Sequence, residues 1–398
     1  MKLLFFTFAP LRSNAGHLAR FSWELYELAK LNEIIIVCLG KEPDNEKTKN
    51  QYRNIIFLHL PVQFIGWNVN NLTETVKNIT SVVQEIYPDL CVLQMEVWDL
   101  MRELGRNFRG KIPFSTVVHA MPFLGSPEYP SGNFEQDVIE YAYTQVEQYR
   151  REYILEHYRE AEEVFKDVSI IANNRTVAFY LGLYFKNVRP WALKPSIVVK
   201  RRDDVNIPEK PFYDFIYMAR MEAGKGVEYL EDILKRISLI LSRPINVALL
   251  GEAEDIISKN ALHQLLINSK QSKYFNVDYI GWADDNIKRK IFSNSGVFIY
   301  PSHYDNFPTV LNEALAFGLP SVTWDVPFAR LNYLSIKAVK QTPFLDFQQF
   351  AENAVMVFQS RKELSIEALN FVKTFDSVEK LAQFDSNTFK EVSKHNYE

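Results

Sequence analysis

The chain has 398 residues, of which 47% are hydrophobic and 14% aromatic, and its formal net charge is −4. This length predicts two or three domains, because single cores seldom grow beyond about 250–300 residues. The apolar fraction excludes a disordered or collagen-like chain, and the near-neutral charge argues against a dedicated nucleic-acid binder.

The first half of the chain alternates short apolar runs with helical patterns. The runs are nearly continuous and rich in β-branched and aromatic residues, as in parallel strands that are covered on both faces. Strands are expected at residues 3–8, 33–39, 55–60, 90–94, 114–119 and 168–173. Helices are expected at 18–31, 71–86 and 98–107, and helical spacing also runs through 134–165. This alternation predicts a doubly wound α/β domain.

A charged stretch with two prolines, residues 200–211, is the expected linker. After it the strand pattern restarts at 215–219, 246–250, 277–280, 297–300 and 321–324. The expected domains are therefore 1–200 and 201–374. Residues 375–398 are expected to form a helix that returns to the first domain.

The cysteines and the apolar runs indicate the cellular compartment in which the protein is expected. Cys38 and Cys91 both lie in apolar runs, so they are expected to be buried thiols in a reducing environment rather than a disulfide framework. No apolar run approaches the roughly 18 residues that a membrane-spanning helix needs. The apolar start of the chain is short and runs into Pro10, which favours a first strand over a signal peptide. We expect a cytoplasmic protein.

The residues after each strand are candidates for function, because ligands bind at the carboxyl ends of strands in α/β sheets and at domain interfaces. Two such domains predict a cleft between two sheets. After the strand at 215–219, Arg220 and Lys225 lie five residues apart around Gly224 and Gly226. Two cations at a glycine-rich turn before a helix suit a diphosphate, and the alternative is a solvated loop. The Walker spacing is missing.

A second polar loop follows the strand at 297–300. Pro308 is expected to open a helix that Gly318 closes, with the N–H groups of its first turn pointing at a ligand. Asp305 lies before this helix and Glu313 lies within it. Two carboxylates suit the vicinal hydroxyls of a sugar or ribose, and the alternative is an N-terminal cap plus one exposed glutamate.

These motifs resemble retaining glycosyltransferases of family 4, which have the GT-B fold of two facing Rossmann-like domains. Asp305 and Glu313 match the family's Glu-x7-Glu pair, with Asp in place of the first Glu. Arg220 and Lys225 match its Arg and Lys. The resemblance runs through residues 213–325 and implies that the donor also contacts Gly251, Gly281, Trp282, Asn306, Phe307, Pro308, Thr309 and Val310.

The first half matches the same family more loosely. Gly16, in Asn14-Ala15-Gly16-His17, stands in the family's Gly-Gly loop, where Ala15 replaces the other glycine. His119 stands where the family often has a histidine near the transferred sugar. The family's Pro-Asn-Gly-Val-Asp segment between the domains is absent, and residues 191–196 stand nearby instead.

The resemblance implies transfer of a hexose-type sugar from a nucleotide-diphosphate sugar, with retention of configuration. Glu313 would bind the ribose, and Gly281 and Trp282 would lie near the base. Arg220, Lys225 and the amides of Thr309 and Val310 would hold the diphosphate and stabilise it as it leaves. We expect no cofactor and no metal, because these cations can replace a divalent ion. Together with His119 and Asp305, Arg220 and Lys225 are the expected catalytic residues.

The acceptor is expected to be a saccharide or a lipid-linked saccharide bound by the first domain. Arg102, Arg106, Arg109 and Lys111 could contact anionic lipid at the inner face of the membrane, or they could form a solvated helix end. Two other functions remain open. They are a sugar-nucleotide epimerase of similar build and a non-catalytic nucleotide-binding protein on a degenerate GT-B fold.

Overall fold

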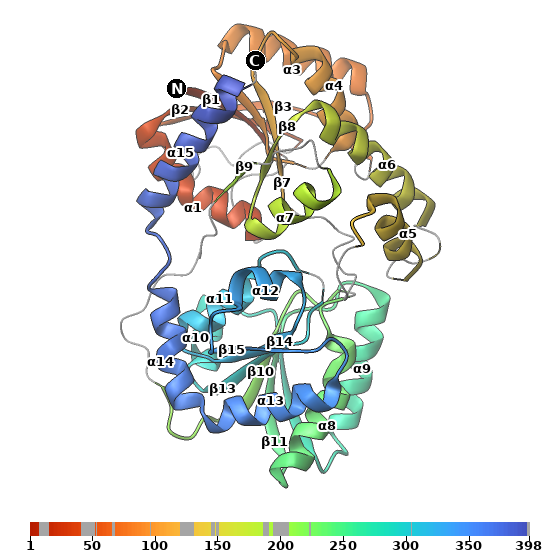
Figure 1. Cartoon of the computed structure of the whole chain (residues 1–398), viewed down its shortest axis with the longest axis vertical. Helices are drawn as coiled ribbons and strands as arrows, with labels where there is room; N and C mark the ends of the chain where they lie inside the picture. Colours follow the sequence, from red (N-terminus) through yellow and green to blue (C-terminus); the bar gives the residue numbers. More distant parts are fainter. Residues whose placement is uncertain are drawn as a thin grey trace. The chain divides into compact units, whose positions relative to one another are not determined.

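The computed structural model divides the chain into two compact units (Figure 1). The first contains Met1–Met121, Ser131–Val198 and Asp376–Glu398, and the second contains Val199–Phe375. The residues that the structure describes are 1–7, 16–40, 52, 54–65, 68–95, 97–119, 131–144, 148, 151–185, 191–193, 207–222, 224–303 and 305–395.

The first unit is built on a seven-stranded parallel sheet with the order β3-β2-β1-β6-β7-β8-β9. Its strands are β1 (Lys2–Thr7), β2 (Glu33–Leu39), β3 (Ile55–Leu60), β6 (Leu90–Leu93), β7 (Phe114–Val118), β8 (Ser169–Ala172) and β9 (Trp191–Ala192). A short antiparallel pair, β4 (Phe64–Ile65) and β5 (Asn68–Val69), lies outside this sheet. Every residue of β6 and β7 is buried, as the continuous apolar pattern predicts.

Helices connect these strands. They are α1 (Gly16–Leu31), α3 (Leu72–Ile86), α4 (Trp98–Phe108), α5 (Phe134–Thr144), α6 (Arg151–Asp167) and α7 (Arg175–Tyr184). Asn71 caps α3 and Asn174 caps α7 through their side chains, which satisfies N–H groups that the first turn leaves unpaired. The helical spacing through 134–165 therefore corresponds to two helices, α5 and α6.

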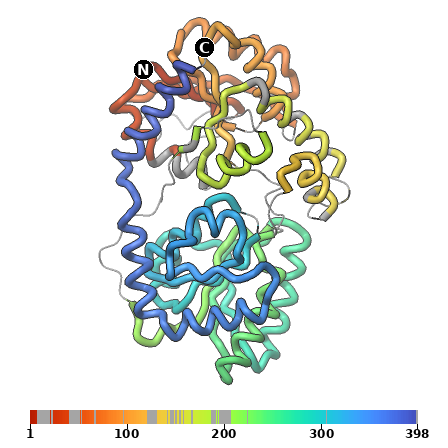
Figure 2. Tube along the Cα trace, viewed as in Figure 1, coloured from red at the N-terminus to blue at the C-terminus, as the bar shows by residue number. Residues whose placement is uncertain are grey.

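The last helix of the chain, α15 (Val378–His395), packs in the first unit against α1 (Figure 2). The Phe389 ring meets the Phe5 ring edge-on, with 5.6 Å between centroids. The Asn32 amide donates to Ser386 Oγ at 3.0 Å, and Ser393 Oγ donates to the carbonyl of Asp89 at 2.8 Å. A C-terminal segment thus completes the core around the first strand.

The second unit contains a six-stranded parallel sheet with the order β12-β11-β10-β13-β14-β15. Its strands are β10 (Tyr213–Met218), β11 (Ile245–Leu250), β12 (Phe275–Gly281), β13 (Ser295–Tyr300), β14 (Ser321–Trp324) and β15 (Val339–Thr342). Its helices are η2 (Val227–Tyr229), α8 (Leu230–Leu241), α9 (Ile256–Ser269), α10 (Asp285–Phe292), α11 (Thr309–Ala316), α12 (Pro327–Tyr333), α13 (Phe347–Gln359) and α14 (Arg361–Val372).

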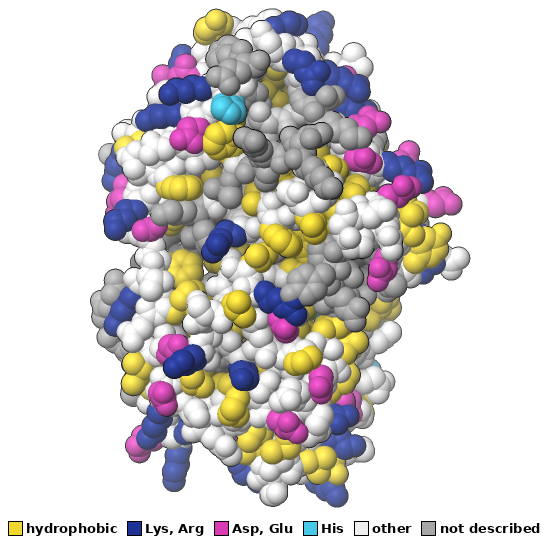
Figure 3. Space-filling view, in the orientation of Figure 1, with side chains coloured by type: hydrophobic (Ala, Val, Ile, Leu, Met, Phe, Trp, Pro, Cys, Tyr) yellow, Lys and Arg dark blue, Asp and Glu magenta, His cyan; other side chains and the backbone are white. Residues whose placement is uncertain are grey.

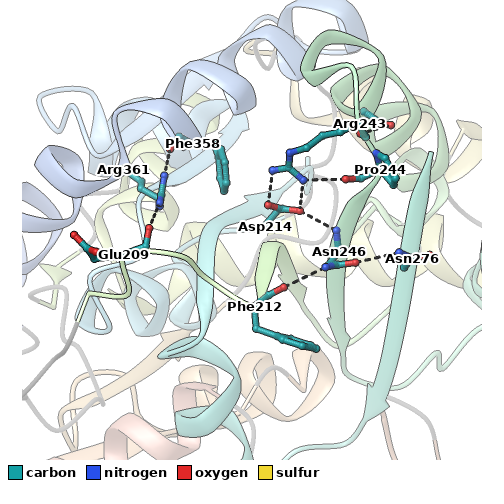
Figure 4. A network of polar contacts seen from close by, with 10 residues as sticks. Glu209, Phe212, Asp214, Arg243, Pro244, Asn246, Asn276, Phe358 and Arg361 are labelled. Atoms are coloured by element: carbon teal, nitrogen blue, oxygen red, sulfur yellow. Dashed lines mark hydrogen bonds and ion pairs between the residues drawn. The ribbon is translucent and has the colours of Figure 1, made fainter. Parts of the chain in front are cut away.

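A polar network closes the amino-terminal edge of this sheet (Figure 4). Arg243 donates to both carboxylate oxygens of Asp214 at 2.7 and 3.0 Å. The same carboxylate accepts from the backbone N–H of Asn246. The Arg361 guanidinium lies over the Phe358 ring and also donates to the carbonyl of Glu209. The chain entering β10 is therefore tied to α14 at the edge opposite to the strands' carboxyl ends.

The surface that Figure 3 displays carries positive and negative side chains interspersed. Arg102, Arg106, Arg109 and Lys111 form a cationic cluster in and after α4. Within it Arg106 pairs with Glu103, and Arg102 pairs with Glu103 and Glu163. Acidic neighbours thus offset part of its charge. Cys38 and Cys91 are buried free thiols. Among the described helices, none combines the length and the apolar character needed to cross a bilayer.

Truncating the α15 anchor tests this packing. Replacing Phe389 with alanine removes a fully buried ring from the first unit's core, so it should lower the free energy of unfolding by about 3–5 kcal/mol. Thermal or urea unfolding measures the change. Lys390→Ala, at the next and exposed position, serves as the control. Equal stability of the two variants would show that α15 does not contribute to the core.

Candidate functional site

The carboxyl ends of the second sheet's strands carry most of the candidate residues. The chain runs from β10 to β11 and β12 on one side of the sheet, and then returns to β13, β14 and β15 on the other. The order therefore reverses between β10 and β13. In open α/β sheets such a switch point opens the crevice in which ligands bind.

Two loops pack tightly against each other at this switch point. Gly226 has φ +85°, and a Cβ atom there would lie 2.2 Å from the carbonyl oxygen of Pro301. The carbonyl of Gly224 accepts from the His303 amide at 3.0 Å and from Ser302 Oγ at 3.2 Å. Only glycine permits this conformation and this approach together. The glycines of the first loop thus bring it against the loop that follows β13.

An ion pair joins the same two loops. Lys225 Nζ lies 3.0 Å from Asp305 Oδ2, and the two side chains are only 13% and 17% exposed. The Tyr300 hydroxyl donates to the same oxygen, and the backbone N–H of Asn306 donates to Oδ1 at 2.9 Å. The carboxylate therefore has charge and hydrogen-bond partners from both sides of the switch point, which offsets the cost of its burial.

Arg220 occupies a different environment from Lys225. Its side chain is 60% exposed, with Nη2 2.7 Å from Glu222 Oε1 and Nε 3.7 Å from Glu254 Oε2. The sequence predicts that Arg220 and Lys225 together neutralise a diphosphate. In the structure the lysine is shielded and pairs with Asp305, whereas the arginine is exposed and lies near two glutamates.

Glu313 lies on α11, which begins without a side-chain cap at Pro308. Its Oε2 is 3.2 Å from Lys288 Nζ, and its side chain is 22% exposed. Burial raises the pKa of Glu313, and Lys288 opposes that rise. The alternative interpretation of this segment, in which a capping Asp305 accompanies an exposed glutamate, is therefore wrong.

Hydrogen bonds hold together the turns that follow β11 and β12. Gly251 has φ +112°, and its amide donates to the carbonyl of Gly281 at 2.8 Å. The Tyr279 hydroxyl donates to the carbonyl of Gly251 at 3.1 Å. Beside them the Trp282 side chain is 60% exposed, so a large aromatic face is open to solvent at this edge.

The other candidates divide between the two units. Asn306, Phe307, Thr309 and Val310 are half-buried and Pro308 is buried, all between β13 and the first turn of α11. His119 is buried directly after β7, and Gly16 begins α1, both in the first unit. The loop residues Asn14 and Ala15 lie outside the described residues, as do residues 200–206 of the expected linker.

Residues 200–331 match the family model described as glycosyl transferases group 1. Through these residues the chain is similar to the glycosyl transferases group 1 family. It is also 24% identical over 148 residues to an uncharacterized glycosyltransferase of Methanocaldococcus jannaschii, in an alignment that spans 36% of this chain and 35% of the relative. About a third of that relative's length is therefore matched.

Solved structures match over nearly the whole chain. Sucrose-phosphate synthase from Thermosynechococcus elongatus superimposes with a TM-score of 0.71 at 14% identity, covering 99% of this chain and 100% of that one. HepE of Anabaena, in complex with UDP and glucose, superimposes with a TM-score of 0.65 at 15% identity, covering 98% and 99%. At such identities the likeness concerns the fold, and that fold is GT-B.

Three contacts of this candidate site were not predicted. Tyr300 supports Asp305, the Tyr217 hydroxyl donates to the carbonyl of Lys225 at 3.1 Å, and Lys288 pairs with Glu313. Tyr300 ends β13 and Tyr217 lies one residue before the end of the neighbouring β10, so strand adjacency could have indicated them. Lys288 lies in the crossover helix α10 and gives no motif signal. Among the described residues, no group of three or more His, Cys, Asp and Glu side chains could hold a metal ion.

The buried His303 gives the site a pH signature. Burial, and then the nearby charge of Lys225, lower the pKa of His303 to about 4. This folded-state pKa is below the ordinary value of 6.5, so the unfolded chain binds a proton more readily than the folded one. The contribution of the neutral His303 to the free energy of unfolding is therefore complete above about pH 6.5 and is lost as the pH falls toward 4. The melting temperature of the wild-type protein should therefore fall more steeply between pH 6.5 and 4 than that of His303→Gln. Parallel profiles would contradict a buried neutral imidazole.

Proposed function

We propose that this chain is a glycosyltransferase that moves a hexose-type sugar from a nucleotide-diphosphate sugar to a saccharide or lipid-linked acceptor, with retention. The observation that carries the proposal is the shielded Lys225–Asp305 pair at the β10/β13 switch point, with Glu313 on the helix that follows. A single shielded cation beside the start of a helix is a setting that favours a phosphate.

The proposed chemistry starts from the diphosphate. Breaking the bond between the anomeric carbon and the phosphate oxygen leaves negative charge on that oxygen. Lys225 and the amides of Thr309 and Val310 would stabilise this charge, with Arg220 at the rim after exchanging its glutamate partners for phosphate. Fixed cations and amides can do this without a divalent metal, so activity should persist in EDTA.

The other donor contacts follow from the remaining side chains. Glu313 would accept hydrogen bonds from the ribose hydroxyls, and the exposed face of Trp282, beside Gly281 and Gly251, would receive the base. Asp305 would contact the sugar through its partly exposed carboxylate. In the first unit, His119 would lie on the sugar side and Gly16 on the phosphate side, and the acceptor would bind to this unit. We propose a cytoplasmic location, with saccharide acceptors as the first class to test because acidic neighbours offset the cationic cluster.

The donor class can be tested with the purified full chain. UDP, GDP and ADP are compared for thermal stabilisation, because a ligand of the folded state raises the melting temperature. UDP is the first choice, since HepE of Anabaena was solved with UDP and glucose. Release of the nucleotide from the matching sugar donor, with and without saccharide acceptors, then measures turnover.

Lys225→Met should lower turnover about 100-fold, because a charge-stabilising donor to the leaving group is lost. Lys259→Met, at an exposed position of α9, is the matched control and should retain turnover. The proposal fails if no nucleotide diphosphate binds, or if Lys225→Met retains wild-type binding and turnover. Binding without any turnover would favour the non-catalytic alternative, and interconversion of donor sugars would favour the epimerase.

A further inference from the structure

The ion pair between α10 and α11 goes beyond the family signature. Glu313 is the sole acidic residue of α11, and its neighbours Leu311, Asn312, Ala314 and Leu315 are buried. A side chain in the second turn of a helix leans back over the first turn, so Glu313 lies over the start of α11. A carboxylate that is 22% exposed in such a setting requires compensation of its charge.

Lys288 provides that compensation from a separate element. Its Nζ lies 3.2 Å from Glu313 Oε2 and 3.3 Å from Asp285 Oδ1. Asp285 is 92% exposed, whereas Lys288 is 23% exposed, so the ammonium points inward from the helix surface. Among the described residues no hydrogen bond reaches Glu313 Oε1, and this second oxygen remains available to accept from a ligand hydroxyl.

We propose that Lys288 is a positioning residue for donor binding, holding Glu313 ionised and oriented so that Oε1 meets the vicinal hydroxyls of the donor's ribose. The inference rests on the proposed function. It assigns the lysine no contact with the reacting atoms. Lys288 fixes one oxygen, and the ligand uses the other.

The charges around Glu313 support this assignment. Burial raises the pKa of Glu313, Lys288 lowers it, and Asp285 raises it slightly further. Several charged groups of the other elements near α11 are paired elsewhere. Arg361 and Lys362 bind Glu209, Glu367 accepts from the Lys337 amide, Arg330 pairs with Asp325, and Asp305 pairs with Lys225. Removing Lys288 therefore leaves the carboxylate with burial and a like charge.

The test measures the dissociation constant of the nucleoside diphosphate that stabilises the wild-type protein, between pH 5 and 8. In Lys288→Gln, the acid limb of the affinity profile should move upward by about one pH unit, and affinity below that limb should fall about tenfold. Donor KM should rise with little change in kcat. Lys288→Arg should restore most of the profile, because it keeps the charge. Lys290→Gln, exposed on the same helix, should match wild type.

The controls separate this inference from the proposed function. Glu313→Gln should abolish the acid limb, and adding Lys288→Gln to it should change affinity no further. If Lys288→Gln lowers only the melting temperature while its affinity profile matches wild type, Lys288 is merely structural and the inference is wrong. If wild type binds no nucleoside diphosphate, the proposed function itself fails.

Discussion

The contact between Lys225 and Asp305 is the constraint around which the carboxyl edge of the second unit's sheet is arranged. Placing two opposite charges 3.0 Å apart with little exposure is costly, because both leave water. The surrounding structure offsets this cost through the Tyr300 hydroxyl and the Asn306 amide. The ion pair also requires that the loops after β10 and β13 touch. Gly226 permits this contact because its backbone lies against Pro301.

A common pattern follows at the other candidate side chains. Lys225 pairs with Asp305, Lys288 with Glu313, and Arg220 with Glu222. A ligand at this edge would therefore meet side chains whose charges are already paired, and of these only Arg220 is proposed to exchange its partner for phosphate. Under the proposed function, the affinity for a diphosphate is the difference between two sets of interactions, and the supporting residues matter as much as the ligand-binding ones.

Much of the fold could be predicted from the sequence, because buried parallel strands are continuous apolar runs. The expected strands at 33–39 and 321–324 agree residue for residue with β2 and β14, which are buried apart from Glu33. The expected strand at 55–60 agrees with β3, an apolar edge strand in which only Ile55 is buried. The edge strand β15, with the sequence Val-Lys-Gln-Thr, and the two-residue β9 were not predicted, since they are too polar or too short to give that signal. The site follows the same division. Motifs indicate Lys225, Asp305 and Glu313, whereas Lys288 becomes visible only when the fold brings α10 beside α11.

The most direct test of the central claim is a double-mutant cycle on nucleoside diphosphate binding. Dissociation constants are measured by calorimetry for wild type, Lys225→Met, Asp305→Asn and the double variant. The account predicts strong coupling, with the double variant binding nearly as well as Lys225→Met alone, because Asp305 acts largely by holding the lysine. Additive losses from the two substitutions, or wild-type affinity in Lys225→Met, would contradict it.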